Sequence, residues 1–328
     1  MTEKLYPLTF NPIFKERIWG GRNLERLFGK PLPVEKVIGE SWEVSDREGD
    51  ESVVNQGPLA GVSLRQLVET YGAELVGVSK LWEGRFPLLV KILDAQQKLS
   101  LQVHPPLDVA SQLGGDPKTE MWFIANCQAN SDLYVGLRTG VSRALFEDKI
   151  QKGLVAECFH RIAVQDGDAL FLPSGRVHAI GSGNVIFEIQ QNSDTTYRVH
   201  DWDRVGLDGK PRELHIDASL KSIDFDDFEP PLVGTAFHQI GDGVKGRSLA
   251  DCEQFIVDQR IAVRHARITA NLPDAATVMG VVKGRFACQG NGVKIEMAAG
   301  EFCLLPATVK SEISALMDDS ECLLASAR

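Results

Sequence analysis

The stretch LSLQVHPP places three polar residues, Ser100, Gln102 and His104, at alternate positions. Side chains alternate between the two faces of a β-strand, so these three share one face and the apolar residues between them share the other. An imidazole nitrogen and an amide oxygen can each bind a metal ion. The pattern fits an ordinary half-buried strand as well as a strand whose polar face lines a site.

A second stretch, KTEMWF, repeats this alternation with Lys118, Glu120 and Trp122 on one face. By itself a Lys and Glu pair of this kind is typical of a solvated strand face. If the two strands lie side by side, however, Gln102, His104 and Glu120 surround one point. The chemistry of such a point is metal binding, because carboxylate and imidazole are both ligands of divalent ions.

A third stretch, FLPSGRVHAI, supplies His178 directly after a predicted turn. A single histidine among apolar residues also fits a hydrogen-bonded core position. Together with His104 and Glu120 it makes two imidazoles and a carboxylate, a set that suits zinc or another first-row divalent ion. Gln102 would be an unusual fourth ligand, and coordination positions would remain for water or substrate, which is typical of a catalytic metal site.

The fourth stretch, VIFEIQQNSDTTYR, places Glu188 on a predicted strand and Arg198 ten residues later. Arg198, Lys118 and Ser100 could together bind a phosphate, since two cations and a hydroxyl offset the acidic background of the chain locally. Further cations follow in a polar loop; ordinary ion pairs explain them, and additional phosphate contacts are the alternative. They are Arg204, Lys210 and Arg212.

The elements that must position these residues are mostly short strands. From about residue 160 onward, apolar runs are stopped repeatedly by Gly, Pro or Asp, which predicts a sandwich or barrel. Helices are predicted after Ser63 and Ser142, which are suitable N-caps, between Pro106 and Gly114, and near residues 218–223. The polar segment 200–232 is the predicted connection between two halves.

The two halves share a pattern. VQDGDALFLPSGRVHAI and MAAGEFCLLPATVKSEI each contain Gly, an acid, three residues and then Leu-Pro. The position of His178 in the first copy is taken by Ser311 in the second. We therefore expect a mainly β fold of two cupin-like barrels or jelly rolls with short helical additions. Residues 1–228 would form the metal-binding domain and residues 229–328 a second domain without metal ligands, to which N-terminal strands could add.

Composition narrows the function further. The 328-residue chain has a net charge of −10, which favours neither nucleic acid nor an anionic membrane as a partner. Its six cysteines form no CxxC motif and are expected to be reduced and mostly buried, as in a cytoplasmic protein. No apolar run is long enough for a signal peptide or a membrane span, so the expected location is the cytoplasm.

The four stretches, in this order, resemble the motifs of class I mannose-6-phosphate isomerases. IWGGRNL and GESWEVS near the N-terminus are similar to those of the shorter bacterial members. The resemblance runs through nearly the whole chain. The brief helical patterns suggest that a large helical insertion of longer members is absent.

This resemblance implies an enzyme that interconverts mannose 6-phosphate and fructose 6-phosphate through an enediol. It also implies one Zn²⁺ per chain, a sugar phosphate as the small-molecule partner, and a monomer or homodimer. The implied zinc ligands are Gln102, His104, Glu120 and His178. Among the other site residues, the resemblance implies catalytic roles for Arg198, Lys118 and Glu188, the last in proton transfer. It implies substrate or phosphate contacts for Ser100, Lys118 and Arg198.

Two other functions use the same residues. Two histidines and a glutamate also form the ligand set of Fe(II) oxygenases, and a non-catalytic sugar-binding cupin could retain a metal. Gln102 as a fourth ligand argues against the oxygenase. The cations Lys118 and Arg198 beside the metal argue against both.

Overall fold

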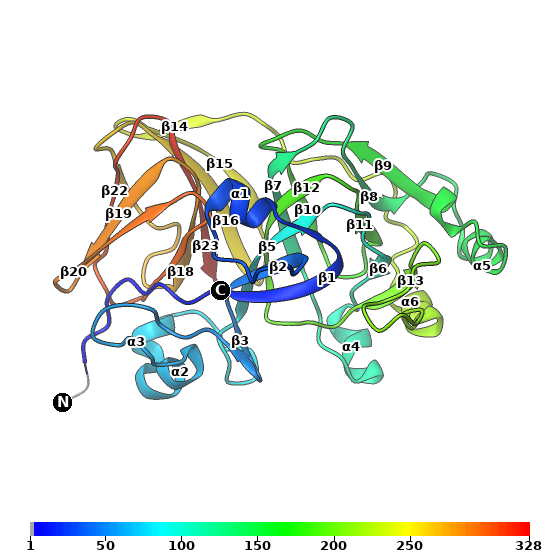
Figure 1. Ribbon diagram of the computed structural model, residues 1–328, viewed down its shortest axis with the longest axis horizontal. Coiled ribbons are helices and arrows are strands. Elements are labelled where there is room, and N and C mark those ends of the chain that lie inside the picture. The colour runs from blue at the N-terminus through cyan, green and yellow to red at the C-terminus, as the bar shows by residue number, and fades with distance from the viewer. Residues whose placement is uncertain (1–2) are drawn as a thin grey trace.

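The computed structural model describes residues 3–328 and is mainly β, as predicted (Figure 1). The first half contains two sheets that face each other. The six-stranded sheet has the order β1 (Ile13–Gly21), β2 (Ile38–Val44), β5 (Leu88–Ala95), β12 (Asn184–Gln191), β7 (Glu120–Cys127), β10 (Ala169–Leu172). The five-stranded sheet has the order β13 (Tyr197–His200), β6 (Leu101–Val103), β11 (His178–Ile180), β8 (Asp132–Leu137), β9 (Phe159–Ala163).

The second half repeats this plan. Its six-stranded sheet has the order β14 (His238–Gly241), β15 (Val244–Asp251), β16 (Phe255–Ala262), β23 (Ser320–Ala327), β18 (Thr277–Lys283), β21 (Phe302–Leu305). Its four-stranded sheet has the order β17 (Arg267–Ile268), β22 (Glu312–Ala315), β19 (Arg285–Gly290), β20 (Val293–Ala298). The order β5-β12-β7-β10 thus corresponds to β16-β23-β18-β21, and β6-β11-β8-β9 to β17-β22-β19-β20. The Leu-Pro motifs end the corresponding strands β10 and β21, which agrees with the predicted duplication.

Short helices and one small hairpin surround the sheets. The helices are α1 (Asn23–Phe28), α2 (Leu64–Tyr71), α3 (Ala73–Val76), α4 (Leu107–Leu113), α5 (Arg143–Gln151) and α6 (Ile216–Ser222), with a 3₁₀ turn at Val155–Cys158 and the hairpin β3 (Asp46–Arg47) and β4 (Asp50–Glu51). The predicted caps are confirmed, since Ser63 and Ser142 each accept a bond from the backbone N–H three residues ahead. Within residues 3–328, no helix is long and apolar enough to cross a membrane.

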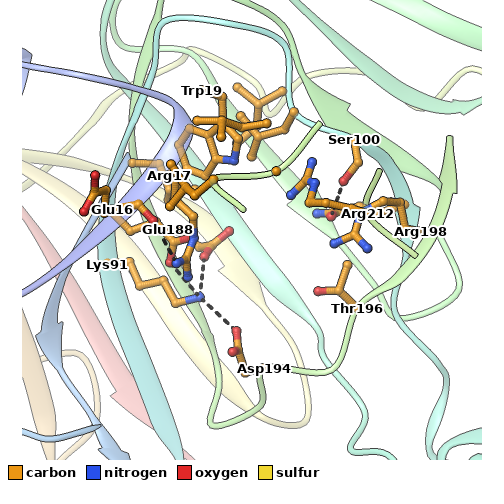
Figure 2. A pocket seen from close by; sticks show the side chains of 18 of the residues that line it. Glu16, Arg17, Trp19, Lys91, Ser100, Glu188, Asp194, Thr196, Arg198 and Arg212 are labelled. Carbon is orange, nitrogen blue, oxygen red and sulfur yellow. Dashed lines mark hydrogen bonds and ion pairs between the residues drawn. The ribbon is translucent and has the colours of Figure 1, made fainter. Parts of the chain in front are cut away.

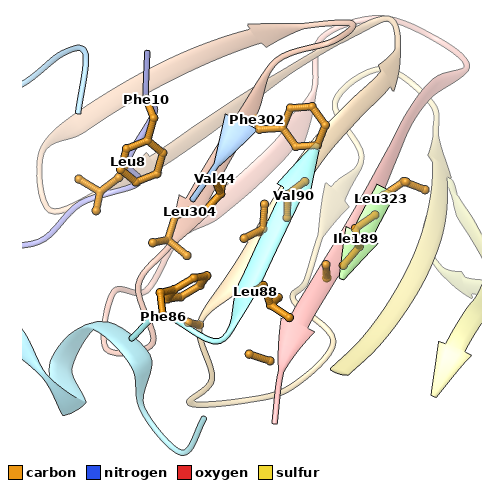
Figure 3. Packing of buried hydrophobic residues seen from close by; sticks show 14 of the residues in the cluster. Leu8, Phe10, Val44, Phe86, Leu88, Val90, Ile189, Phe302, Leu304 and Leu323 are labelled. Atoms are coloured by element: carbon orange, nitrogen blue, oxygen red, sulfur yellow. The ribbon is translucent and has the colours of Figure 1, made fainter. Parts of the chain in front are cut away.

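The two six-stranded sheets form the central layers and share one hydrophobic core (Figure 3). Leu88 and Val90 of β5 pack in this core with Leu304 and Leu323 of the second half. The N-terminal segment joins it through a backbone bridge between Leu8 and Leu304. Because faces alternate along β5, Leu89 and Lys91 point the other way, toward the five-stranded sheet.

Two strands are shorter than the sequence predicts. β7 begins at Glu120, so Lys118 precedes the strand and does not belong to it. β6 contains only Leu101–Val103, so Ser100 and His104 flank the strand and do not belong to it. Pro105 and Pro106 limit the strand at its end, because proline donates no backbone hydrogen bond. The alternation nevertheless persists, since Leu101 and Val103 are buried in one cluster while Gln102 lies on the opposite face.

Candidate active site and metal centre

Strand register brings the residues of the site together from distant parts of the chain. In the five-stranded sheet, Arg198, Gln102 and His178 are cross-strand partners in one row. In the facing six-stranded sheet, Glu120 pairs with Gln190 and so lies on the same face as Glu188 and Trp122. The two rows face each other across the space between the sheets.

Three of the four predicted metal ligands form a tight cluster. The ligand atoms of His104, Glu120 and His178 all lie within 4.8 Å of one another, and all three residues are buried. The two oxygens of Glu120 face the two rings separately, at 3.4 Å from His178 Nε2 and 3.6 Å from His104 Nε2. A single ion between them would be reached by all three side chains.

Backbone carbonyls orient both imidazoles. His104 Nδ1 lies 2.8 Å from the carbonyl oxygen of Thr195, and His178 Nδ1 lies 2.9 Å from that of Arg176. A carbonyl oxygen only accepts, so each Nδ1 carries the proton and each Nε2 presents a free lone pair to the cluster. Metal-binding histidines are oriented in this way by a second partner.

Gln102 lies at the edge of the cluster. Its amide nitrogen Nε2 is 3.3 Å from His178 Nε2, and its oxygen Oε1 is 3.4 Å from the Ser100 hydroxyl. As oriented, the amide nitrogen faces the ring, whereas a metal ligand would have to offer oxygen. Rotation of the amide by 180° exchanges the two atoms without moving the rest of the side chain.

The electrostatics of the cluster fit a bound cation. Burial lowers the pKa of His178 to about 4, and burial together with Lys118 holds the pKa of His104 well below its usual value. Both rings are therefore neutral at pH 7, as metal ligation requires. Burial raises the pKa of Glu120 to about 7. Its Oε2 is paired with the Lys118 ammonium at 3.1 Å, whereas its Oε1 is buried without a hydrogen-bond partner. Such an acceptor is costly in a protein interior unless a cation satisfies it.

Lys118 lies against the same cluster. Its Nζ is 3.1 Å from Glu120 Oε2 and 3.3 Å from His104 Nε2. The negative charges of Glu120 and Glu188 raise the pKa of Lys118 above its usual value although burial opposes this. The side chain is therefore an ammonium ion at pH 7, which can donate a proton or stabilise negative charge but cannot act as a base.

A cleft of about 580 Å³ opens beside the cluster and is lined by both sheets (Figure 2). Of the predicted site residues, the cleft is lined by Ser100, Gln102, Lys118, Glu188 and Arg198. His104, Glu120 and His178 do not line it, so the candidate ligands lie behind its wall with Gln102 and Lys118 between.

One end of the cleft carries two guanidinium groups and two hydroxyls. Ser100, Thr196, Arg198 and Arg212 line it together. Burial and the nearby Arg212 charge lower the pKa of Arg198, so the protein holds two like charges close together. The Nε of Arg198 is buried without a hydrogen-bond partner, while its Nη1 donates to the Glu213 carbonyl at 2.8 Å.

Two cations of the polar loop, Arg204 and Arg212, form ion pairs. Arg204 and Arg212 both pair with Asp201, and Arg212 does so through two nitrogens at 2.7 and 2.5 Å. Ordinary ion pairs thus explain both residues, as predicted. Arg212 differs from Arg204 because it also lines the cleft.

Glu188 lies in the wall of the cleft beside Trp122 and two lysines, Lys91 and Lys118. Trp122 Nε1 donates to Glu188 Oε1 at 2.8 Å, and Lys91 Nζ is 3.5 Å from Oε2. Burial opposes ionisation here, but the charges of Lys118 and Lys91 outweigh it and lower the pKa of Glu188. Glu188 is therefore a carboxylate at pH 7 that is free to accept a proton.

The sequence analysis missed several residues of the cleft. Lys91 is a single cation within FPLLVKILDA, and Glu40 lies in GESWEVS, both of which indicate only strands. The further residues Glu16, Arg17, Trp19 and Asp194 also line the cleft. A charged residue in the middle of an otherwise apolar strand was the one available signal, because buried lysines are rare unless paired.

Comparisons with known proteins agree with this geometry. Residues 8–120 match the family model described as phosphomannose isomerase type I, catalytic domain. The chain is 36% identical over 312 residues to a probable mannose-6-phosphate isomerase, GmuF, of Bacillus subtilis, covering 92% of this chain and 94% of that protein. It is 40% identical over 253 residues to mannose-6-phosphate isomerase ManA of the same organism, covering 76% and 78%.

Solved structures give the same result. The mannose 6-phosphate isomerase from Bacillus subtilis superposes with a TM-score of 0.88 at 29% identity, over 98% of this chain and 99% of that one. A putative mannosephosphate isomerase from Archaeoglobus fulgidus superposes with a TM-score of 0.77 at 21% identity, which shows the shared fold, over 99% and 98%. With more than a third of its residues identical to those of a relative over nearly the full length of both, the chain belongs to the type I phosphomannose isomerase family.

Proposed function

We propose that this chain is a zinc-dependent aldose–ketose isomerase that interconverts mannose 6-phosphate and fructose 6-phosphate. The observation that carries the proposal is the arrangement of His104, Glu120 and His178 behind a cleft whose one end is lined by Arg198 and Arg212. The names of the relatives and the family model support the same substrate pair. They do not favour the two alternatives, an iron-dependent oxygenase and a non-catalytic sugar-binding protein.

In this proposal Gln102, His104, Glu120 and His178 hold the zinc ion, Gln102 through its amide oxygen. Two imidazoles, a carboxylate and an amide oxygen leave room for a further ligand, as catalytic zinc sites do. When bound, the ion supplies Lewis acidity toward a substrate oxygen, worth several kcal/mol of charge stabilisation.

The phosphate would occupy the end of the cleft lined by Ser100, Arg198 and Arg212. Two guanidinium groups and a hydroxyl provide hydrogen-bond donors and positive charge, which are the features that recognise a phosphate. Arg212, which is held by Asp201, would be the second cation that binds the phosphate in this chain. This orientation leaves the carbonyl end of the sugar near Lys118 and Glu188.

The isomerisation moves one proton between the two carbons. The C2–H bond of the aldose breaks, the electron pair forms the enediolate, and the proton is returned to C1 while a hydroxyl proton moves between O2 and O1. We propose that Glu188, an ionised carboxylate in the cleft wall, removes this carbon-bound proton and returns it. Lys118 and Lys91 would donate to the oxygens on which negative charge develops, and Arg198 would steady that charge or the phosphate.

We also propose that residues 1–228 form the catalytic unit and residues 229–328 a second cupin-like unit without metal ligands. The matching strand orders support this division, as does the polar segment 200–232 between the halves. The N-terminal bridge from Leu8 to Leu304 supports a contribution of the first strands to the second unit.

An assay of purified protein with mannose 6-phosphate, coupled to detection of fructose 6-phosphate, tests the function. The expected result is turnover that requires the metal, together with one zinc ion per chain. Turnover of neither sugar phosphate by zinc-loaded protein would contradict the proposal.

A further inference from the structure

Glu40 is a buried carboxylate in the cleft wall for which the proposed reaction gives no role. It lies on β2, next to β5, where Trp42 of the same strand pairs directly with Lys91. Its side chain is only 8% exposed and lines the cleft. Buried carboxylates are costly unless they are paired, so its partners indicate what it does.

Those partners are two cations and an indole. Arg17 Nε donates to Glu40 Oε1 at 2.8 Å, and Trp42 Nε1 donates to Oε2 at 2.7 Å. The same Oε2 lies 3.8 Å from Lys91 Nζ. Burial acts to raise the pKa of Glu40, but Lys91, Arg17 and the two hydrogen bonds outweigh it and lower the pKa to about 2. Glu40 is therefore charged throughout the working pH range and does not exchange protons there.

Lys91 in turn depends on few contacts. Its Nζ lies 3.5 Å from Glu188, 3.8 Å from Glu40 and 3.9 Å from Asp194, and 4.9 Å from the centre of the Trp42 ring (Figure 2). These distances are long for hydrogen bonds, so the ammonium group keeps donors available for a ligand. Asp194 is half exposed. Among residues 3–328, Glu40 and Glu188 are the buried anions that pair with Lys91.

We propose that Glu40 is a positioning residue for the isomerisation, which acts through Lys91 by holding its ammonium group against the Trp42 ring and over the cleft. The inference rests on the proposed function and adds to it, since neither the sequence motifs nor the proposed chemistry requires Glu40. Arg17 completes the arrangement by neutralising the side of Glu40 that faces away from Lys91.

The chain contains a matched control on the same strand. Glu43 lies three residues further along β2, is also buried, and pairs with Lys30 at 2.7 Å on the opposite face, away from the cleft. Glu43→Gln removes a buried, ion-paired carboxylate as Glu40→Gln does, but without touching Lys91. A loss that comes from destabilising β2 would appear in both variants.

The experiment is a double-mutant cycle with kcat and KM measured for mannose 6-phosphate. Glu40→Gln should lower kcat by roughly 10–100-fold with little change in KM, because a misplaced group costs rate and not binding. Glu43→Gln should keep kcat within roughly twofold of the natural protein. In a Lys91→Met background, Glu40→Gln should cause no further loss, because the group through which it acts is already absent.

Equal losses from Glu40→Gln in the presence and absence of Lys91 would overturn the inference, as would an unchanged kcat or equal losses in the two glutamine variants. Zinc content and thermal unfolding are measured for every variant. Glu40→Gln should retain its zinc ion and its fold. If Glu40→Gln does not fold, Glu40→Asp keeps the charge but withdraws it from Lys91, and should lower kcat less than Lys91→Met does. Absence of isomerase activity in the natural protein would instead refute the proposed function.

Discussion

The six-stranded sheets of the two halves contain corresponding cross-strand rows of residues. The side chains in these rows are mostly charged or aromatic in the first half and mostly small or apolar in the second. In the first half one row across the six-stranded sheet is Trp42, Lys91, Glu188, Trp122, Leu170. The corresponding row of the second half is Ser248, Asp258, Leu324, Met279, Cys303. The ion-paired centre of the first row, Lys91 and Glu188, has only one charged counterpart, Asp258, which is paired with Arg260 instead.

The neighbouring row shows the same contrast at the metal cluster. Glu120 and Gln190 correspond to Thr277 and Ser326, whose hydroxyls bond to each other at 2.7 Å. His178 corresponds to Ser311. Around these positions the second half packs a dry core that includes Cys288 and Cys303, with their sulfurs 3.9 Å apart. The framework therefore fixes where side chains point, and their chemistry decides whether the space between the sheets becomes a cleft or a core.

The largest effect is expected when the first half is given the second half's residue. His178→Ser copies Ser311 and removes one imidazole from the cluster, so bound zinc should be lost. Activity should fall on the order of 10³-fold or more, since the metal supplies several kcal/mol. Metal analysis and kcat measure this, with Ser311→Ala as the control that should retain both. A His178→Ser variant with stoichiometric zinc and normal kcat would mean that the cluster is not the metal site.

Arg198 sharpens the comparison because its strand, β13, has no counterpart in the four-stranded sheet of the second half. Arg198→Ala should lower kcat by roughly 10²–10³-fold, the cost of losing a group that stabilises developing charge. Arg198→Lys should not restore the rate, because lysine lacks the planar fork of donors. Zinc content should stay unchanged in both variants. If only KM rises, Arg198 anchors the phosphate and has no part in the chemical step.

Glu40 gives the first half a specific acid sensitivity. Its pKa is lowered to about 2 in the folded protein from 4.5, so its stabilising contribution is complete above about pH 4.5 and is lost as the pH falls toward 2. The difference corresponds to about 3 kcal/mol, since one pKa unit is worth about 1.4 kcal/mol. The free energy of unfolding, measured by urea denaturation, should therefore fall less steeply across this window in Glu40→Gln than in the natural protein. Parallel curves would show that Glu40 is not held by its cationic partners.

Glu321 in the second half should behave in the opposite way, with a smaller effect. Burial raises the pKa of Glu321 more than the hydrogen bond from Gln259 lowers it. A raised carboxyl pKa means that stability is lost as the pH rises above the unfolded value. Glu321→Gln keeps an acceptor for Gln259 and removes the buried charge, so the Tm at pH 7 should increase modestly. A decrease would mean that the charge itself stabilises the second half.

Local signals in the sequence were sufficient for most helices and strands, although they did not predict the helix α1 or the strand β1. Ser63 and Ser142 begin helices as predicted, and Gly114 follows the helix that Pro106 precedes. These features depend on a few neighbouring residues, since caps and turns are local interactions. The alternation of Gln102 and Glu120 likewise indicated the face on which each lies.

The remaining part of the site depends on pairing between distant strands. Lys91 meets Glu188 because β5 pairs with β12, nearly a hundred residues later, and meets Trp42 because β5 pairs with β2. Neither register can be read from FPLLVKILDA, whose apolar residues indicate only a buried strand. The role of Glu40 as a partner of Lys91 follows from the same pairing and was therefore visible only in the folded chain.

We propose that a single ion held by His104, Glu120 and His178 makes this cleft an isomerase. This proposal is tested most directly by removing metal with a chelator and titrating zinc back while following conversion of mannose 6-phosphate to fructose 6-phosphate. Turnover should be negligible without metal and should recover linearly until it saturates at one zinc per chain. Full turnover by metal-free protein, or saturation of zinc without any turnover, would contradict it.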